Sequence, residues 1–429
     1  MKTEHKILVF PAGTEIAFEI HNALRNSKFV KLYGATSVPC HANFLYETCE
    51  EWLPNANDPM LIGSLNKLID KWGIEYIYPA HDDALLNLTK EQDKLNAKVV
   101  TSDWDTVRVC RSKLYTYLYL YPVDYLPKFY THEWQVPEFP MFLKPAVGQG
   151  SYGTKLVKNR DELSEFLAKA KENYVICEYL PYAEFTVDCF TDRHGQLRYV
   201  GQRTRERIRN GIAVRSRFVE TDPTVQKIAE DLNERFDFNG AWFFQVKEDK
   251  NGELKLMEVA PRIAGTMGLS RNLGVNLPLL TLYNHWGMDV EIMANDNSLL
   301  LDRAFISRYQ TDVEYDTVYV DLDDTLIVRG KVNPYLIAFL YQAKDKGKKI
   351  VLLSKHKGNC VNTLEDHNID IYLFNAIINL EDWDEKKKYI QLNSIFIDDS
   401  FLERKRVREC CGIPVFDSDA VECLFDWRA

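Results

Sequence analysis

The stretch FLKPAVGQGSYGTKLV, residues 142–157, places a glycine-rich turn between two short segments that read as strands. Gly148, Gly150 and Gly153 fit the G-x-G-x-x-G spacing of dinucleotide-binding folds, in which the glycines join a strand to a helix. Here the strand-like segment TKLVK follows the glycines, and a helical pattern begins only after it. We therefore expect the glycines to close a β-hairpin. Lys144 precedes this loop, whereas the phosphate-binding lysine of protein kinases lies on a later strand.

The first hundred residues alternate between strand and helix patterns, as in a doubly wound α/β domain. Residues 6–10, KILVF, read as a buried strand, and a short loop leads to a helical pattern over 15–26. A second strand ends at Pro79, with polar residues at its tip and another helical pattern behind it. The loop after the first strand lacks G-x-G-x-x-G, which disfavours nucleotide binding there, and residues 81–83 are interpreted as a helix cap.

The Asn-Gly pair at 210–211 lies between two alternating segments and predicts a hairpin. Every second residue over 203–209 is arginine, so these side chains would share one face of a single strand. Two interpretations stay open. The segment is either a solvent-exposed edge strand with Glu206 opposite Arg215, or a face that binds a carboxylate or a phosphate.

The Asn-Gly pair at 251–252 predicts a second hairpin and allows its register to be counted. With a two-residue loop, Lys250 faces Glu253, and counting back places Gln245 opposite Glu258. The Cβ atoms of such a pair lie about 5 Å apart on one face of the sheet. An amide oxygen and a carboxylate so placed suit Mg²⁺, which takes few protein ligands besides substrate phosphates. A plain cross-strand hydrogen bond is the alternative.

Three apolar runs in the last third of the chain end in acidic or hydroxyl residues. The runs VYVDLD, KIVLLS and IFIDDS each read as a buried strand. Their ends carry Asp321, Asp323, Ser354, Asp398 and Asp399. Carboxylates are costly to bury without a cation, so three such ends at one sheet edge are hard to explain structurally. The arrangement suits a carboxylate that attacks phosphate at the tip of a buried strand.

The elements over about residues 5–305, taken in order, resemble the ATP-grasp enzymes, in particular those like the carbamoyl-phosphate synthase large subunit and the pyrrolysine-biosynthesis ligase. The resemblance implies a multidomain α/β protein with an ATP-grasp fold. Its parts would be an N-terminal doubly wound α/β domain over 1–102 and two α+β ATP-clamping subdomains over 103–310. By the same resemblance, ATP would be contacted by Lys113, Lys144, Gly148, Gly150, Ser151, Gly153, Glu178, Tyr179, Leu180 and Glu184.

The same family implies an ATP-dependent ligase that needs Mg²⁺. Gln245 and Glu258 would be magnesium ligands, and Arg262 would steady a phosphorylated intermediate. Such enzymes transfer the γ-phosphate of ATP to a carboxylate, and an amine then attacks the acyl phosphate to form an amide. One departure is Ala260, which stands where the family has a metal-binding Asn. Either water or substrate replaces this ligand, or the activity is weakened or lost.

Residues 313–429 resemble the haloacid-dehalogenase superfamily, with a small Rossmannoid fold. About 30 residues separate the first aspartate from the serine, and about 45 separate the serine from the last aspartate pair, so there is no room for a large cap. The resemblance implies a nucleophile at Asp321, a general acid and base at Asp323, loop fixation by Thr325 and phosphoryl binding by Ser354. Lys386, preferred over Lys387 and Lys388, would offset transition-state charge. The magnesium ligands would be Asp321, Asp323, Asp398 and Asp399.

The composition excludes several classes of partner. At 429 residues the chain is long enough for two or three domains, and its net charge of -10 argues against a nucleic-acid partner or an anionic membrane. The first residues have too short an apolar run for a signal peptide, and no segment is long enough to span a membrane, so we expect a cytoplasmic protein. Nine cysteines without a C-x-x-C spacing indicate reduced thiols.

The sequence thus predicts a bifunctional enzyme. An ATP-dependent ligase would join a small carboxylate to an amine, at least one of them anionic, and a Mg²⁺-dependent phosphatase would act on a phosphorylated metabolite. One alternative is a phosphatase whose degenerate ATP-grasp region serves as a substrate-binding scaffold. Another is a nucleotide-sensing module without turnover. A homodimer is expected only because dimers are common among the ligases that the chain resembles.

Overall fold

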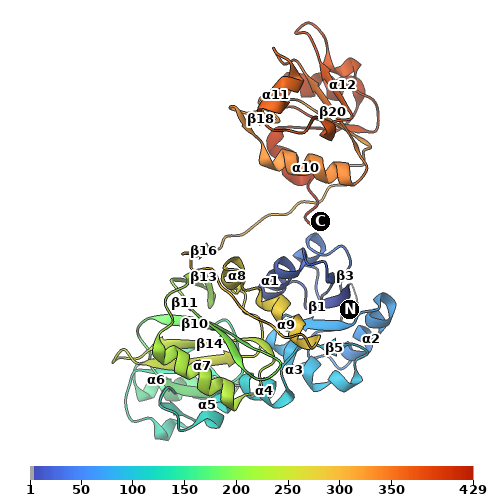
Figure 1. Cartoon of the computed structure of the whole chain (residues 1–429). Helices are drawn as coiled ribbons and strands as arrows, with labels where there is room; N and C mark the ends of the chain where they lie inside the picture. Colours follow the sequence, from blue (N-terminus) through green and yellow to red (C-terminus); the bar gives the residue numbers. More distant parts are fainter. Residues whose placement is uncertain (1–3, 429) are drawn as a thin grey trace. The chain divides into compact units, whose positions relative to one another are not determined.

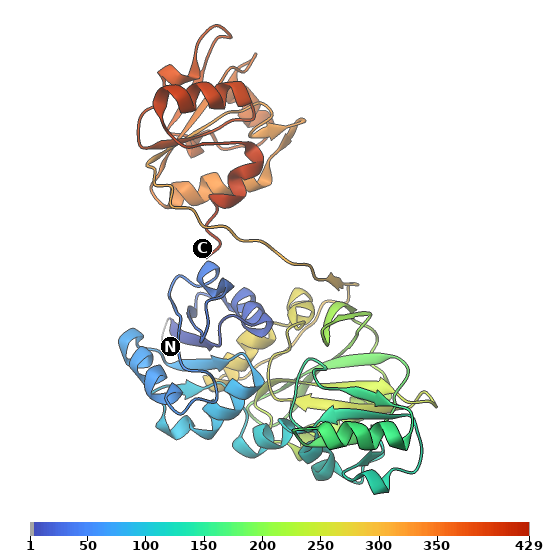
Figure 2. The ribbon, with the colours of Figure 1, turned by 180° about the vertical axis from the view of Figure 1, so that it is seen from behind.

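The structure is a computed structural model, and it describes residues 4–428. Contacts divide the chain into two compact units, one ending at Phe305 and the other beginning at Ile306. The opposite views in Figures 1 and 2 show that each unit combines strands with helices.

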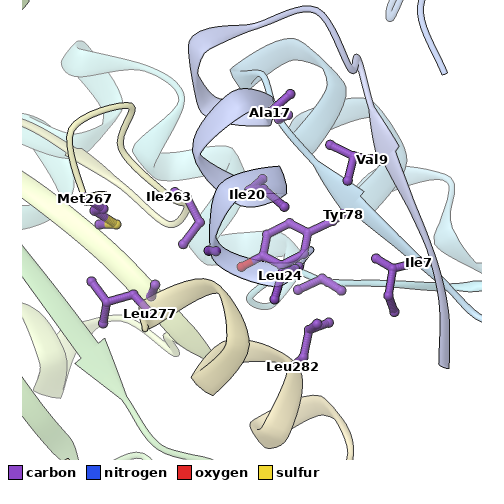
Figure 3. Packing of buried hydrophobic residues seen from close by; sticks show 14 of the residues in the cluster. Ile7, Val9, Ala17, Ile20, Leu24, Tyr78, Ile263, Met267, Leu277 and Leu282 are labelled. Carbon is purple, nitrogen blue, oxygen red and sulfur yellow. The ribbon is translucent and has the colours of Figure 1, made fainter. Parts of the chain in front are cut away.

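The N-terminal sheet is parallel and has the order β3-β2-β1-β4-β5, with β1 (His5–Phe10), β2 (Val30–Ala35), β3 (Cys49–Glu50), β4 (Tyr76–Pro79) and β5 (Lys98–Val99). The helices around it are α1 (Glu15–Leu24), α2 (Leu61–Trp72), α3 (Asp82–Lys90) and α9 (Leu277–His285). Successive side chains of a strand point to opposite faces, so Ile7 and Val9 pack with α1 and α9, whereas Leu8 and Phe10 pack with α2 and α3. Figure 3 shows the first of these cores.

Two antiparallel sheets and a smaller one complete the first unit. The β7 sheet has the order β6-β9-β7-β8, with β6 (Phe129–Tyr130), β7 (Met141–Pro145), β8 (Lys155–Val157) and β9 (Tyr174–Glu178). The β10 sheet has the order β11-β10-β14-β15, with β10 (Glu184–Thr191), β11 (Leu197–Thr204), β14 (Gly240–Glu248) and β15 (Leu254–Ala260). The small sheet has the order β12-β13-β16, with β12 (Arg207–Arg209), β13 (Ile212–Arg217) and β16 (Leu300–Asp302). The remaining helices are α4 (Trp104–Cys110), α5 (Lys113–Leu120), α6 (Arg160–Lys169), α7 (Pro223–Arg235) and α8 (Gly268–Asn272).

The two faces of the β10 sheet differ in polarity. Val187 and Phe244 lie opposite each other and pack in a core with the apolar side of α7. Thr186 and Gln245 form the next pair, so their side chains point to the other face. This polar face lines the cavities described below.

The glycine-rich stretch joins β7 to β8 in an antiparallel pair, with Met141 opposite Val157, so the predicted hairpin is confirmed. The Asn-Gly pair at 210–211 also forms its predicted two-residue turn, with positive φ angles of 50° and 75°.

The hairpin between β14 and β15 has the predicted pair at the site but a different turn. Gln245 lies opposite Glu258, as counted, whereas the pairing closer to the turn is shifted by one residue. The loop has three residues, 250–252, and a β-bulge beside the Gln245 pair restores the counted register. The expectation that Lys250 faces Glu253 is therefore wrong. The predicted pairing of Gln245 with Glu258 is confirmed, because the one-residue shift at the turn and the one-residue shift at the bulge cancel.

The arginine-rich segment does not form the single strand that was predicted. β11 ends at Thr204 in the β10 sheet, and β12 begins at Arg207 in the small sheet. Arg203 and Arg209 therefore lie in different sheets. Partners in both sheets hold the two halves apart, because Arg203 pairs with Asp188 and Arg207 pairs with Asp302.

The second unit is built on a parallel sheet of order β21-β20-β17-β22-β23, with β17 (Thr317–Val320), β20 (Lys349–Ser354), β21 (Ala376–Asn379), β22 (Ser394–Ile397) and β23 (Val415–Phe416). Its helices are α10 (Pro334–Asp345), α11 (Cys360–Asp366) and α12 (Phe401–Cys411), and a short hairpin pairs β18 (Ile327–Val328) with β19 (Lys331–Val332). Because β17 lies between β20 and β22, the carboxyl ends of these three strands meet at one edge.

All nine cysteines are free thiols, as the spacing indicated. Within residues 4–428, no helix combines the length and the apolar character needed to cross a bilayer.

Candidate active sites

A cavity of about 190 Å³ lies between the β7 and β10 sheets. Most residues predicted to contact ATP or magnesium line it. They are Lys113, Lys144, Gly148, Gly150, Ser151, Glu178, Tyr179, Leu180, Glu184, Gln245 and Glu258. Gly153 belongs to the same loop, but a Cβ there would lie 3.0 Å from Pro145 and 3.2 Å from Tyr174. Its positive φ of 74° shapes the loop.

Two lysines bring positive charge to this cavity. Lys144, at the end of β7, is 4% exposed, and its Nζ lies 3.4 Å from the hydroxyl of Tyr117. Burial lowers the pKa of Lys144, and the charge of Lys113 acts in the same direction. Lys113 donates to the carbonyl of Gly148 at 3.1 Å and lies 3.6 Å from the carboxylate of Glu258. A buried ammonium group with few acceptors suits an anionic ligand.

Gln245 and Glu258 face each other across β14 and β15 at the edge of this cavity. Among the hydrogen bonds of residues 4–428, none involves the side chain of Gln245, so the pair does not form the plain cross-strand bond that was the alternative. An amide and a carboxylate with free oxygen lone pairs are suitable ligands for Mg²⁺. Ala260, two residues beyond Glu258, offers no ligand atom.

The glycine-rich loop meets the turn between β12 and β13. A Cβ on Gly211 would lie 2.2 Å from the carbonyl carbon of Gly150, so only glycine fits at this contact. Arg205 supports the turn, because its guanidinium donates to the carbonyl of Gly211 at 2.8 Å and pairs with Glu184 at 2.6 Å.

A second cavity, of about 300 Å³, lies between the polar face of the β10 sheet and loops of the N-terminal sheet. Arg262 lines it and makes two hydrogen bonds to Asp82, at 2.6 and 2.7 Å. Burial acts to raise the pKa of Asp82, but the charge of Arg262 outweighs it and holds this pKa well below its ordinary value. The prediction that residues 81–83 cap a helix did not include this role of Asp82. Only His81 caps the helix, as its Nδ1 accepts from the amide of Asp83.

The arginines of the 203–209 segment divide between this cavity and the surface. Arg203 and Arg205 line the cavity, although each also has an acidic partner, Asp188 for Arg203 at 2.8 Å and Glu184 for Arg205. On the surface, Arg215 pairs with Glu206 at 3.2 Å, as the first interpretation expected. The remaining two arginines lie outside the residues that line the cavity.

In the second unit, three aspartates and a lysine meet at the carboxyl edge of the sheet. Lys386 donates to Asp321 at 2.7 Å and to Asp398 at 2.6 Å. Burial raises the pKa of Asp398 to about 6, and it raises the pKa of Asp321. Burial acts to lower the pKa of Lys386, but the two carboxylates outweigh it and raise this pKa. Of the three adjacent lysines, 387 and 388 pair instead with acidic residues at 384 and 385.

Ligand atoms of Asp321, Asp398 and Asp399 lie within 4.8 Å of one another, which suits a cation with oxygen ligands such as Mg²⁺. Thr325 donates to Asp399 at 3.1 Å and accepts from its amide at 2.9 Å, so the threonine fixes this loop. The Ser354 hydroxyl is buried at the end of β20 without a well-oriented hydrogen-bond partner in residues 4–428.

Asp323 differs from the other predicted ligands. Its side chain lies outside the group of three aspartates and contacts His356 instead. His356 was not among the predicted site residues, although it lies only two residues after Ser354 at the end of β20.

Comparisons with known proteins agree with the geometry of the first unit. A model of the family described as "ATP-grasp in the biosynthetic pathway with Ter operon" matches residues 170–301. The curated proteins contain no match.

Several solved structures resemble the chain at low sequence identity. The biotin carboxylase domain of the Hydrogenobacter thermophilus 2-oxoglutarate carboxylase has 13% identity and a TM-score of 0.55, covering 69% of this chain and 73% of that chain. The N5-carboxyaminoimidazole synthetase from Staphylococcus aureus has 14% identity and a TM-score of 0.54, with coverage of 69% and 79%. The N5-carboxyaminoimidazole ribonucleotide synthetase from Thermus thermophilus has 15% identity and a TM-score of 0.55, with coverage of 69% and 82%. The first unit of the chain therefore has the ATP-grasp fold that its sequence predicted.

Proposed function

We propose that the chain is a bifunctional enzyme, an ATP-dependent carboxylate-amine ligase joined to a Mg²⁺-dependent phosphatase. The observation that carries the ligase part is the junction of the two cavities of the first unit. Eight residues line both: Lys113, Gly148, Gln149, Gly150, Arg205, Gly211, Gln245 and Glu258. A phosphate held among these residues would face a second, arginine-lined cavity, which is where a carboxylate must lie to receive it.

In the proposed ligase reaction, ATP occupies the cavity between the β7 and β10 sheets, and the carboxylate occupies the larger one. Lys113 and Lys144 would neutralise phosphate charge, and Gln245 with Glu258 would hold Mg²⁺, which reduces the charge of the phosphates when bound. The carboxylate oxygen attacks the γ-phosphorus and ADP leaves. The amine then attacks the acyl carbon, the bond from this carbon to the phosphate oxygen breaks, and the amide forms with release of inorganic phosphate and the amine's proton. Arg262 lines the cavity where this acyl phosphate would form.

The ligands of similar structures support this choice of substrates. The Staphylococcus aureus synthetase is complexed with ADP, and the Hydrogenobacter thermophilus domain with MgADP and bicarbonate. Lys113, Lys144 and the glycine-rich loop offer this chain comparable means to bind ATP with Mg²⁺. We propose, in addition, that the substrates are a carboxylate and an amine and that the protein forms a homodimer.

The proposed phosphatase belongs to the haloacid-dehalogenase type, and the aspartate cluster of the second unit supports it. Asp321 would attack phosphorus while protonated Asp323 gives its proton to the leaving oxygen, forming an aspartyl phosphate and an alcohol. Water then attacks phosphorus and passes a proton to Asp323, so that phosphate leaves and Asp321 is restored. Asp321, Asp398 and Asp399 would hold Mg²⁺. Lys386, with its ammonium beside Asp321, would offset phosphoryl charge.

Ala260 supports a rival proposal, in which the first unit only binds substrate for the phosphatase. Ala260 lines the larger cavity, and its methyl side chain supplies no metal ligand where the resemblance to ATP-grasp enzymes leads us to expect an Asn.

The decisive experiment measures ADP and phosphate release from ATP over a panel of amino acids and small carboxylates. We expect one pair of substrates to provoke ADP release that Glu258→Ala abolishes and Asp321→Asn preserves. Phosphate release from phosphoesters should show the reverse dependence. If no pair provokes ADP release while Asp321-dependent phosphatase activity persists, the ligase proposal fails and the scaffold proposal stands.

Gly211→Ala is expected to weaken ATP binding by about tenfold, which corresponds to about 1.4 kcal/mol. The added Cβ would push the turn at Gly211 away from Gly150, and the glycine-rich loop would lose its support over the phosphates. Isothermal titration calorimetry with ATP and Mg²⁺ measures the effect. Gly195→Ala is the matched control, because its φ of 76° is similar but a Cβ there would meet nothing within 4 Å. An equal loss in both variants would assign the effect to backbone strain.

A further inference from the structure

His356 lies on the loop after β20, beside the aspartate cluster, and no proposed step uses it. Its Nδ1 is 3.0 and 2.9 Å from the two carboxylate oxygens of Asp323. Its Nε2 is 2.8 Å from the hydroxyl of Thr363 in α11. The imidazole thus joins a helix of the second unit to the carboxyl group that would transfer protons.

The loop that carries His356 is fastened on three sides. Lys355 bonds to the carbonyl of Asp382 at 3.4 Å and pairs with Glu403 of α12 at 3.1 Å. The carbonyl of Gly358 accepts from the Asn379 side chain at 2.7 Å. The imidazole is therefore held by its loop as well as by Thr363.

The side chain of Asp323 is less restricted by its surroundings than the side chains of the neighbouring aspartates. Its side chain is 55% exposed, whereas those of Asp321 and Asp398 are buried against Lys386. Within residues 4–428, the imidazole of His356 is the hydrogen-bond partner of the Asp323 side chain. An exposed carboxyl group without this bond would sample several rotamers, and few of them would point its oxygen at the reacting phosphate.

We propose that His356 is a positioning residue, which holds the carboxyl group of Asp323 in the orientation needed for both proton transfers. The proposal rests on the phosphatase function proposed above. If the Thr363 hydroxyl donates to Nε2, the Nδ1 proton is left for Asp323. His356 itself gains and loses no proton. Asp323 gives a proton to the leaving oxygen in the first step and takes one from water in the second.

The test compares two phosphomonoesters that differ in their need for an acid. Nitrophenolate leaves without much help, whereas an alkoxide needs protonation. Hydrolysis of p-nitrophenyl phosphate and of glycerol phosphate by the full chain with Mg²⁺ should therefore respond differently to loss of the imidazole. For His356→Ala, we expect kcat to fall about 100-fold with glycerol phosphate, within the range of general acid catalysis, and by about threefold or less with the nitrophenyl ester.

Three further variants distinguish the loss of this positioning contact from a general loss of folding. His356→Asn keeps an N–H donor near the position of Nδ1 and should recover most of the glycerol phosphate activity. Thr363→Val, which removes only the bond to Nε2, should show a smaller loss with the same preference between esters. Lys357→Ala is the control on the same loop and should behave as wild type.

The outcomes separate the two proposals. An equal loss with both esters, or no recovery in His356→Asn, would overturn the positioning role while wild-type phosphatase activity stands. If wild type hydrolyses neither ester, or if Asp321→Asn retains full activity, the phosphatase proposal fails and the positioning role fails with it.

Discussion

Lys386→Met is expected to lower the free energy of unfolding of the second unit by about 3–5 kcal/mol when Mg²⁺ is absent. The ammonium group lies 2.7 Å from Asp321 and 2.6 Å from Asp398, and both carboxylates are buried. Its removal leaves two buried carboxylates close together without a compensating charge. The pKa of each should rise further, because desolvation and mutual repulsion both disfavour the ionised form.

Magnesium should rescue this variant more than it stabilises wild type. A cation held by the aspartates replaces the lost charge, and a ligand that binds only the folded state stabilises it in proportion to its occupancy. Hydrogen exchange of peptides from the second unit, with Mg²⁺ and with a chelator, reports this unit separately. Lys387→Met is the matched control, since that lysine pairs with Glu385 at the surface, and we expect no change. If peptides of the second unit exchange hydrogen at the same rate in Lys386→Met without Mg²⁺ as in wild type, the prediction is contradicted.

Lys144→Met is expected to weaken ATP binding by about 100-fold and, at the same time, to stabilise the protein without nucleotide. Charge-assisted hydrogen bonds contribute about 1.5–3 kcal/mol each, which sets the size of the affinity loss. The stability gain follows from burial, because burying an ammonium group without a close ionic partner costs free energy that an apolar side chain of similar volume does not cost. Opposite signs for affinity and stability distinguish a ligand-binding lysine from a structural one.

The pH dependence gives a second measure of Lys144. Burial lowers the pKa of Lys144 in the folded protein below its ordinary value of 10.5, so unfolding takes up a proton at pH values between the folded and unfolded pKa. Wild-type stability should therefore rise as the pH rises through this window, and Lys144→Met should lose that slope. Denaturant unfolding between pH 7 and 10, with and without ATP, measures both effects. A variant that is less stable than wild type at every pH would show that the ammonium group is already well paired in the empty site.

Short-range patterns predicted much of the candidate machinery. The Asn-Gly turn and the strand alternation placed Gln245 opposite Glu258. This pairing is correct only because the longer turn and the β-bulge shift the register by one residue in opposite directions. The apolar runs that end in Asp321 and Asp398 indicated that these residues meet at one sheet edge, because adjacent parallel strands end together. Which of the three adjacent lysines enters the cluster was stated only as a preference, and the structure brings Lys386 to both aspartates.

The missed features depend on contacts between distant segments. Asp82 and Arg262 are 180 residues apart, and no local pattern at residue 82 distinguishes an ion-pair partner from a helix cap. The crossing of the chain between two sheets after Thr204 was missed for the same reason. The alternation of arginines continues across this crossing without interruption. The sequence does not show that Arg203 pairs with Asp188 in one sheet while Arg207 pairs with Asp302 in the other.

The shared lining of the two cavities in the first unit has a thermodynamic consequence. Lys113 and Arg205 contribute charge to both volumes, so an anion in either one changes the free energy of placing an anion in the other. Thermodynamic linkage makes this effect reciprocal. If an anion in one cavity lowers the affinity of the other cavity for its anion by some factor, its own affinity is lowered by the same factor. A cation between Gln245 and Glu258 would belong to neither cavity alone, and it would convert mutual repulsion of the two occupants into cooperative binding.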